Sequence, residues 1–244
     1  MMAYHHAERL PTVHGAELDR RLAAGWFRMH QDIFTTTHLF TDDEFHRVHW
    51  LRYEVDRIQD RASHRRIRKL NAVYRVTIDN FNGITGDHAE LFARYRASIN
   101  FDGANSIAHA LFNDGNPDEN PFHTKRISIH DGNRLIAGGY FDIGATAGTS
   151  ILHFFDPDYR RFSLGRFMML VTIDYLHAHG YTLYYPGYVV SGKAKMNYKL
   201  FLGRDLATYF DPITGDWLPF DERILEPERL NEIDKLQLAI SFLG

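Results

Sequence analysis

The stretch that decides the fold covers residues 149–185 and reads TSILHFFDPDYRRFSLGRFMMLVTIDYLHAHGYTLYY. Its first seven residues, 149–155, are rich in β-branched and aromatic side chains and predict a strand. A loop begins at Asp156-Pro157, and Ser163 then stands where a helix N-cap is expected. The stretch therefore predicts a strand, a loop and a helix in direct succession.

The predicted helix runs from Ser163 to about Ala178, and its apolar residues lie nearly all round. A helix with this pattern is largely buried. Gly180 is expected to end it, and residues 181–185 predict the next strand, which breaks at Pro186-Gly187. We therefore expect a buried helix that joins two strands of one sheet.

The N-terminus of this helix is the first candidate binding site. Its free N–H groups and the positive end of its dipole attract anions, and three arginines around it add positive charge. The residues predicted to contact an anion there are Arg160, Arg161, Ser163, Gly165 and Arg166.

A hairpin precedes the deciding stretch. Residues 125–130 and 134–143 predict two strands around the turn Asp131-Gly132-Asn133. Hairpin, strand, loop, buried helix and strand is the element order of a GNAT acyltransferase core, which the chain resembles in this respect. The resemblance implies an α+β fold in layers, with a mixed sheet and helices on both faces.

The first half of the chain is less regular. A Gly/Asn/Asp/Pro-rich loop at 113–121 separates it from the second half, so we expect an N-terminal segment over residues 1–120 and a GNAT-like domain over residues 121–244. Within the first half, the pattern predicts helices near 15–24, 63–70 and 87–99, and strands near 33–40, 48–56 and 73–79.

Composition excludes several classes of site. The 244 residues contain no cysteine, which rules out disulfides, thiolate nucleophiles and Cys-ligated metal or iron–sulfur sites. The spacing of the fifteen histidines matches no metal-ligand pattern. No apolar run approaches the roughly 18 residues of a membrane span, and Met1–His6 contain no apolar signal core. We therefore expect a cytoplasmic protein with no metal and no membrane partner.

Several short elements form a pattern along the chain. They are Phe154-Phe155-Asp156-Pro157, Ser163-Leu164-Gly165, Gly187-Tyr188 and Lys195-Met196-Asn197-Tyr198-Lys199. This pattern resembles the C-terminal domain of the arginyl- and leucyl-tRNA–protein transferases, in which a YDP strand end precedes SLG, a buried helix, GY and a KMxYK element. The order and spacing agree over about residues 134–202, with weaker matches to the family's N-terminal segments at Gly25-Trp26-Phe27-Arg28 and Ser63-His64-Arg65-Arg66. The family's N-terminal cysteine cluster has no counterpart here.

The resemblance implies an aminoacyl-tRNA–protein transferase, which moves an amino acid of the arginine or leucine class from a charged tRNA to a protein N-terminal amine. The tRNA ester is then the donor substrate, and no cofactor is needed. Because such an ester is activated, catalysis requires positioning, oxyanion stabilisation and one proton transfer. The implied partners are an aminoacyl-tRNA and the N-terminus of an acceptor protein or peptide.

Three candidate catalytic residues follow from the resemblance. Tyr188 and Tyr198 are interpreted as a proton donor and a platform for base stacking, with core packing as the alternative. Asp156 either orients the acceptor amine or caps the turn with Pro157, and the turn is preferred. The break at Pro186-Gly187 is expected to offer backbone groups to an oxyanion or an amine.

The remaining candidates are basic and would contact tRNA. Lys193, Lys195 and Lys199 either touch the tRNA 3′ end or belong to a solvated helix face. The net charge is −3, but residues 57–75 hold seven Lys or Arg, so a local basic face is expected. The predicted backbone contacts on it, with a plain surface charge run as the alternative, are Arg65, Arg66, Arg68 and Lys69.

Two other functions stay open. One is a CoA-dependent GNAT N-acetyltransferase, which would use acetyl-CoA. Enzymes of that kind usually carry Q/R-x-x-G-x-G/A at the loop–helix junction, whereas Phe162 and Phe167 occupy the first and last of those positions around Gly165. Bulk there would crowd a pyrophosphate, which favours a donor other than CoA. The other alternative is a non-catalytic relative that binds RNA or peptide.

Overall fold

The computed structural model describes residues 5–100, 103–113 and 115–243. Residues 1–4, where the sequence has no apolar signal core, lie outside this range, as do Asp114 of the predicted loop 113–121 and Gly244. Within the described ranges, no helix combines the length and the apolar character that crossing a membrane requires.

Nine strands of the described chain form one mixed sheet in the order β12-β11-β5-β10-β9-β8-β7-β6, with β4 paired to β5 off this path. Strands β9 and β10 run parallel, and the other pairings in this sheet are antiparallel. Strands from both sides of residue 120 share the sheet. Their bounds are β4 His38–Thr41, β5 Glu44–Glu54, β6 Arg75–Asn80, β7 Thr124–Asp131, β8 Arg134–Ile143, β9 Ala147–Phe155, β10 Leu183–Val190, β11 Thr208–Phe210 and β12 Trp217–Pro219.

Helix α5 (Leu164–Ala178) connects β9 to β10 and packs on the sheet. Leu164, Met168, Leu170 and Leu176 are fully buried, in agreement with the apolar pattern around the whole helix. Burying one such side chain contributes about 1.5–3 kcal/mol, so this helix holds much of the central core together. The fold prediction is confirmed: hairpin, strand, buried helix and parallel strand follow in GNAT-like order.

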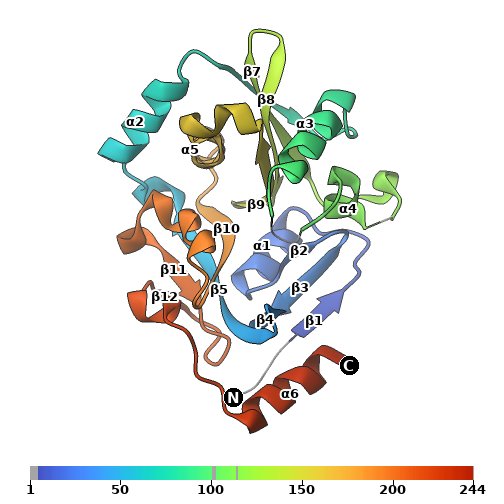
Figure 1. Ribbon diagram of the computed structural model, residues 1–244, viewed down its shortest axis with the longest axis vertical. Helices are drawn as coiled ribbons and strands as arrows, with labels where there is room; N and C mark the ends of the chain where they lie inside the picture. The colour runs from blue at the N-terminus through green and yellow to red at the C-terminus, as the bar shows by residue number, and fades with distance from the viewer. Residues whose placement is uncertain (1–4, 101–102, 114, 244) are drawn as a thin grey trace.

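Helices cover both faces of the strands β7 to β9 (Figure 1). Helices α2 (Ala62–Asn71) and α5 lie on one side, and α3 (Gly86–Ala97) and α4 (Ile107–Phe112) lie on the other. The second side has its own apolar cluster, which includes Leu91, Phe112 and Phe154. The sheet is therefore the middle layer of a three-layer arrangement in this part of the molecule.

A smaller layer comes from the N-terminal residues. Strands β1 (His5–Glu8), β3 (Asp32–Thr36) and β2 (Phe27–Met29) form a separate antiparallel sheet, and α1 (Ala16–Ala23) packs beside it. Its apolar cluster joins Phe27 and Ile33 to Trp50 of β5. The described chain ends with helix α6 (Glu232–Leu243), which lies apart from the sheet in Figure 1.

Three local predictions need correction. Ser163 stands at the N-cap position of α5 but has left-handed backbone angles, φ 54° and ψ 41°, and its side chain makes no capping hydrogen bond. The predicted loop after Asp156 is a 3₁₀ helix, Pro157–Phe162, which sets up that geometry. The strand at 181–185 does not end at Pro186-Gly187, because β10 continues to Val190 through a bulge.

Candidate active site

Strands β9 and β10 part beyond a short paired segment. They pair at Leu183–Ala147, Tyr184–Gly148 and Tyr185–Thr149, and no further. The bulge in β10 lies between Tyr184 and Gly187, and a matching irregularity in β9 leaves Ile151 without a partner on β8. Gly187 has φ 96°, a conformation that favours glycine. The two bulges bend the strands away from each other and open the sheet.

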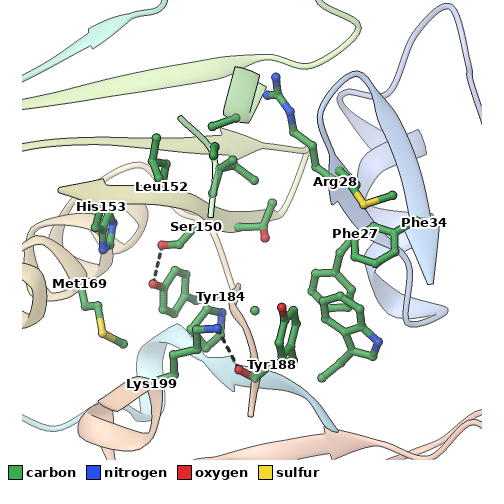
Figure 2. Close-up of a pocket in the computed structure, with 18 of the residues that line it drawn as sticks. Phe27, Arg28, Phe34, Ser150, Leu152, His153, Met169, Tyr184, Tyr188 and Lys199 are labelled. Atoms are coloured by element: carbon green, nitrogen blue, oxygen red, sulfur yellow. Dashed lines mark hydrogen bonds between the residues drawn. The ribbon is translucent and has the colours of Figure 1, made fainter. Parts of the chain in front are cut away.

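A cavity of about 380 Å³ lies where β9 and β10 part (Figure 2). That volume falls at the small end of ligand pockets. The walls come from β9 and β10, from the 3₁₀ helix η4 (Ala194–Leu202) that follows β10, and from β2, β3 and β5. The described residues that line it are Phe27, Arg28, Met29, His30, Phe34, Trp50, Ala104, Ala110, Thr149, Ser150, Ile151, Leu152, His153, Met169, Tyr184, Pro186, Gly187, Tyr188, Tyr198 and Lys199.

One end of the cavity is aromatic. Phe27 stacks on Trp50 with 3.7 Å between ring centroids, and Phe34 meets the same indole edge-on at 5.4 Å. Tyr188 also contacts Trp50 edge-on, at 5.0 Å. Aromatic contacts of this kind give a rigid apolar wall.

The other end carries Lys199, His153 and Met169, which lie together in Figure 2. The Lys199 ammonium donates a hydrogen bond to the Tyr188 carbonyl oxygen at 2.8 Å and lies 4.5 Å from the centre of the Tyr188 ring. Burial lowers the pKa of Lys199 to about 8. Burial, with the nearby charge of Lys199, lowers the pKa of His153 to about 4, so this imidazole is neutral at pH 7.

Arg28 is held by a different environment. Its guanidinium forms an ion pair with Asp142 at 3.0 Å, and both side chains are fully buried. It also donates to Thr124 and to the carbonyl oxygens of His30 and Leu111. The pair therefore ties β2 to the sheet, and the positive charge of Arg28 is already matched.

The described lining of the cavity includes three tyrosines, and their hydroxyl groups differ in hydrogen bonding and exposure. The hydroxyls of Tyr184 and Ser150 are hydrogen-bonded at 2.7 Å. Tyr198 is 41% exposed, yet the protein around it raises its pKa to about 12 by desolvation. Burial also raises the pKa of Tyr188. At pH 7 both remain protonated and can donate hydrogen bonds.

Comparison with known proteins supports the family resemblance. Residues 87–203 match the family described as "Arginine-tRNA-protein transferase, C terminus". This range covers the parted strands, the crossover helix and η4. Residues 87–203 of this chain are therefore similar to the C-terminal part of that transferase family.

Curated members of this family extend the match. The chain is 34% identical over 111 residues to an aspartate/glutamate leucyltransferase from Acinetobacter baumannii. The aligned region covers 44% of this chain and 38% of that protein. It is 27% identical over 179 residues to the protein of the same name from Aeromonas salmonicida, covering 71% and 70%. The chain thus spans less than half of the Acinetobacter relative.

Solved structures give weaker likenesses. FemX superposes with a TM-score of 0.46 at 11% identity and covers 79% of this chain and 64% of that one. L-PGS from Bacillus licheniformis superposes with a TM-score of 0.41 at 10% identity, covering 59% and 46%. Neither is close enough to align individual residues.

The family motifs after β10 meet at the cavity. Gly187, Tyr188, Tyr198 and Lys199 all line it, although they come from two separate elements. The aromatic wall from Phe27, Phe34 and Trp50 was not among the candidates. The weak family-like segment Gly25-Trp26-Phe27-Arg28 was the one signal in the sequence that pointed to this wall.

The predicted residues around the α5 N-terminus lie elsewhere. Arg161 packs against the Phe162 ring at 4.8 Å and Arg166 against Phe201 at 5.5 Å, while Arg160 donates to the Ser98 carbonyl oxygen. The structure does not bring these candidates to the cavity of Tyr188, Tyr198 and Lys199. The predicted site residues absent from the described lining are Asp156, Arg160, Arg161, Ser163, Gly165, Arg166, Lys193 and Lys195.

Asp156 occupies the turn position that the sequence favoured. Its carboxylate accepts a hydrogen bond from the Asp158 N–H and pairs with Arg134 at 2.6 Å and Arg94 at 3.3 Å. Burial alone would raise the pKa of Asp156, but the hydrogen bond from Asp158 and the charge of Arg134 hold it below its usual value. The carboxylate caps the 3₁₀ helix and lies outside the cavity lining.

Several predicted tRNA-binding cations are already engaged with protein groups. Lys193 pairs with Asp42 at 2.6 Å. On α2, Arg68 pairs with Asp174 and Arg65 donates to the Asp60 carbonyl oxygen. The side chains of Arg65, Arg66 and Lys69 are exposed on the outer face of that helix.

Proposed function

We propose that this chain transfers an aminoacyl group from a charged tRNA to the N-terminal amine of a protein or peptide. The observation that carries the proposal is the cavity between β9 and β10, where the family motif residues Gly187, Tyr188, Tyr198 and Lys199 meet. The family match over residues 87–203 supports the same reaction class. The aminoacyl-tRNA is the donor substrate, and the proposal includes no resident cofactor.

The cavity supplies what aminolysis of an activated ester needs. The neutral acceptor amine attacks the ester carbonyl, the new C–N bond forms, and the tRNA 3′ oxygen leaves. The bulges at Ile151 and between Tyr184 and Gly187 interrupt strand pairing, and N–H groups left unpaired there can stabilise the developing oxyanion. The hydroxyls of Tyr188 and Tyr198 are candidates to pass the proton to the leaving oxygen.

A leucyl donor suits the cavity better than an arginyl donor. The described lining contains no Asp or Glu, and one end is built from Phe27, Phe34 and Trp50. An arginyl side chain would be buried there without a counter-charge, which is costly, whereas a leucyl side chain carries no charge to desolvate. The relatives named aspartate/glutamate leucyltransferase support the same choice, and with it an acceptor that begins with Asp or Glu.

A transfer assay tests this function. Labelled Leu-, Arg-, Phe- and Met-tRNA are each combined with peptides that begin with Asp, Glu, Asn, Gln, Lys or Ala. We expect transfer of leucine to the Asp and Glu peptides. Transfer of arginine alone would reverse the donor assignment. Binding of tRNA without transfer in any combination would indicate the non-catalytic relative.

One further arm separates the acetyltransferase alternative. Phe162 lies between Tyr74 and Tyr159 in an aromatic cluster at the start of α5, so little space is left for a pyrophosphate there. Calorimetry with acetyl-CoA should therefore show no binding. Micromolar affinity for acetyl-CoA would favour the CoA-dependent enzyme.

A further inference from the structure

In the described part of the chain, Lys199 is a cation in the cavity without a carboxylate partner. Among the residues that the structure describes, it forms no ion pair, and its one hydrogen-bond acceptor is the Tyr188 carbonyl oxygen at 2.8 Å. The lowered pKa of Lys199 has burial as its cause, with no acid offsetting it. A buried charge without a partner is unfavourable. An unpaired ammonium group in a binding cavity is explained if the ligand carries the anionic group that pairs with it.

The position of Lys199 places that ligand group close to the reacting atoms. A side-chain carbon added to Gly187 would lie 3.3 Å from the Lys199 ammonium, so the ammonium stands directly over the β10 bulge. Figure 2 shows Lys199 on the side of the cavity opposite Phe27 and Phe34. The apolar end suits the donor side chain, which leaves the cationic end to the acceptor.

We infer that Lys199 recognises the acceptor by pairing its ammonium group with the side-chain carboxylate of an acidic N-terminal residue. The inference rests on the proposed function and names the residue that sets acceptor specificity within it. The acceptor carboxylate loses hydrogen bonds to water when it binds, and the ion pair with the Lys199 ammonium offsets that loss. A neutral Asn or Gln side chain would leave the ammonium without an opposite charge.

The tRNA backbone is the competing source of an anion. Its phosphates carry charge outside the aminoacyl group, whereas Lys199 lies inside a cavity of about 380 Å³ and is partly shielded by the Tyr188 and Tyr198 rings. Exposed cations such as Arg66 and Lys69 are better placed for phosphates.

The experiment measures acceptor preference. Peptides that differ only in their first residue, Asp against Asn and Glu against Gln, are compared for kcat/KM with Leu-tRNA and for binding by calorimetry. The proteins are wild type, Lys199→Gln, Lys199→Arg and the surface control Lys235→Gln, whose lysine pairs with Glu232 on α6. Gln keeps a donor for the Tyr188 carbonyl oxygen but removes the charge.

We expect wild type and Lys235→Gln to prefer Asp over Asn by roughly 10- to 100-fold, the effect of one charged hydrogen bond. In Lys199→Gln the ratio should fall towards one, and Lys199→Arg should keep much of it. An equal loss of rate for all four peptides, or a rise in the KM for tRNA with an unchanged Asp/Asn ratio, would overturn the inference.

Two measurements keep the test decisive if the variants fold poorly or transfer is absent. In wild type, the Asp/Asn ratio should drop between pH 7 and pH 9.5 as Lys199 loses its proton. The other titratable groups beside it, His153, Tyr188 and Tyr198, do not change charge in that window, because the first is neutral and the tyrosine pKa values are raised. If no aminoacyl-tRNA reacts, the proposed function is wrong. Equal binding of the Asp and Asn peptides would then show independently that the inference about Lys199 is wrong.

Discussion

Arg28 and Lys199 line the same cavity, yet the protein treats their charges in opposite ways. Arg28 meets Asp142 at 3.0 Å, with both side chains fully buried, and fills its remaining donors with Thr124 and backbone oxygens. Lys199 has one carbonyl oxygen and two aromatic rings around it. One cation is a structural link between two sheets, and the other is left for a ligand.

The difference shows that the presence of a cation in a cavity does not by itself define a binding residue. What matters is whether the protein already supplies the opposite charge. A cation that is paired with a carboxylate of the protein stabilises the fold and gains little from an anionic ligand. An unpaired cation can form its ion pair with the ligand and so contribute to binding. Removing each residue should therefore damage a different property of the protein.

The largest effect is expected from Arg28→Met. The substitution leaves Asp142 buried without a partner, which typically costs about 3–5 kcal/mol of stability. Denaturant unfolding at pH 7 measures this loss. Arg20→Met is the control, because Arg20 pairs with Glu17 on the exposed side of α1 and should change stability by less than about 0.5 kcal/mol.

A double variant sharpens the comparison. Arg28→Met combined with Asp142→Leu removes both charges together and should recover part of the lost stability, since no unpaired charge remains. If Arg28→Met is as stable as wild type, Asp142 is not held by this pair, and the contrast with Lys199 loses its basis.

A smaller effect on stability is expected from Lys199, and it depends on pH. The folded-state pKa of about 8 lies below the ordinary value of 10.5. Below pH 8 both folded and unfolded chains bind this proton, and the buried charge disfavours the fold. Between about pH 8 and 10.5 the unfolded chain holds the proton that the folded protein has released, so the free energy of unfolding rises with pH.

Lys199→Gln should lack that rise. The difference in unfolding free energy between wild type and variant, compared at pH 7 and pH 10, should change by on the order of 1–2 kcal/mol, because solvent at the cavity mouth screens part of the effect. Titration of tyrosines in the unfolded chain is common to both proteins and cancels. A pH-independent difference would mean that Lys199 is paired or fully solvated.

The same contrast explains what sequence reasoning reached and what it missed. The helix at 164–178 and the strand at 134–143 were predicted with these bounds, because apolar periodicity and turn residues act locally. Tyr188, Tyr198 and Lys199 were found through family motifs, which mark residues but not their surroundings. The described residues that line the cavity around Lys199 include no carboxylate, and this depends on residues far apart in the chain.

Long-range packing accounts for the other misses. Phe27, Phe34 and Trp50 form the aromatic wall because β2 and β3 pack against Trp50 of β5, which no local pattern reveals. Asp142 lies 114 positions after Arg28, and nothing in the spacing links them. Ser163 illustrates the opposite error, since a good capping residue was placed in a left-handed conformation by the 3₁₀ helix before it.

The smallest effect on stability concerns the surface cations of α2. Arg65→Ala with Arg66→Ala removes two exposed charges and should alter stability by less than about 0.5 kcal/mol. If these residues bind tRNA phosphates, the salt dependence of tRNA binding should weaken by about one unit of slope for each phosphate that is no longer bound.

Arg68→Ala is the matched control, because Arg68 pairs with Asp174 and Asp60 and its charge is already neutralised. We expect tRNA affinity across a salt series to change for the double variant and to stay nearly constant for Arg68→Ala. Equal salt slopes in all three proteins would place the tRNA-binding surface away from α2, and weaker binding with Arg68→Ala alone would show that a paired cation can still bind, against the rule drawn from Arg28 and Lys199.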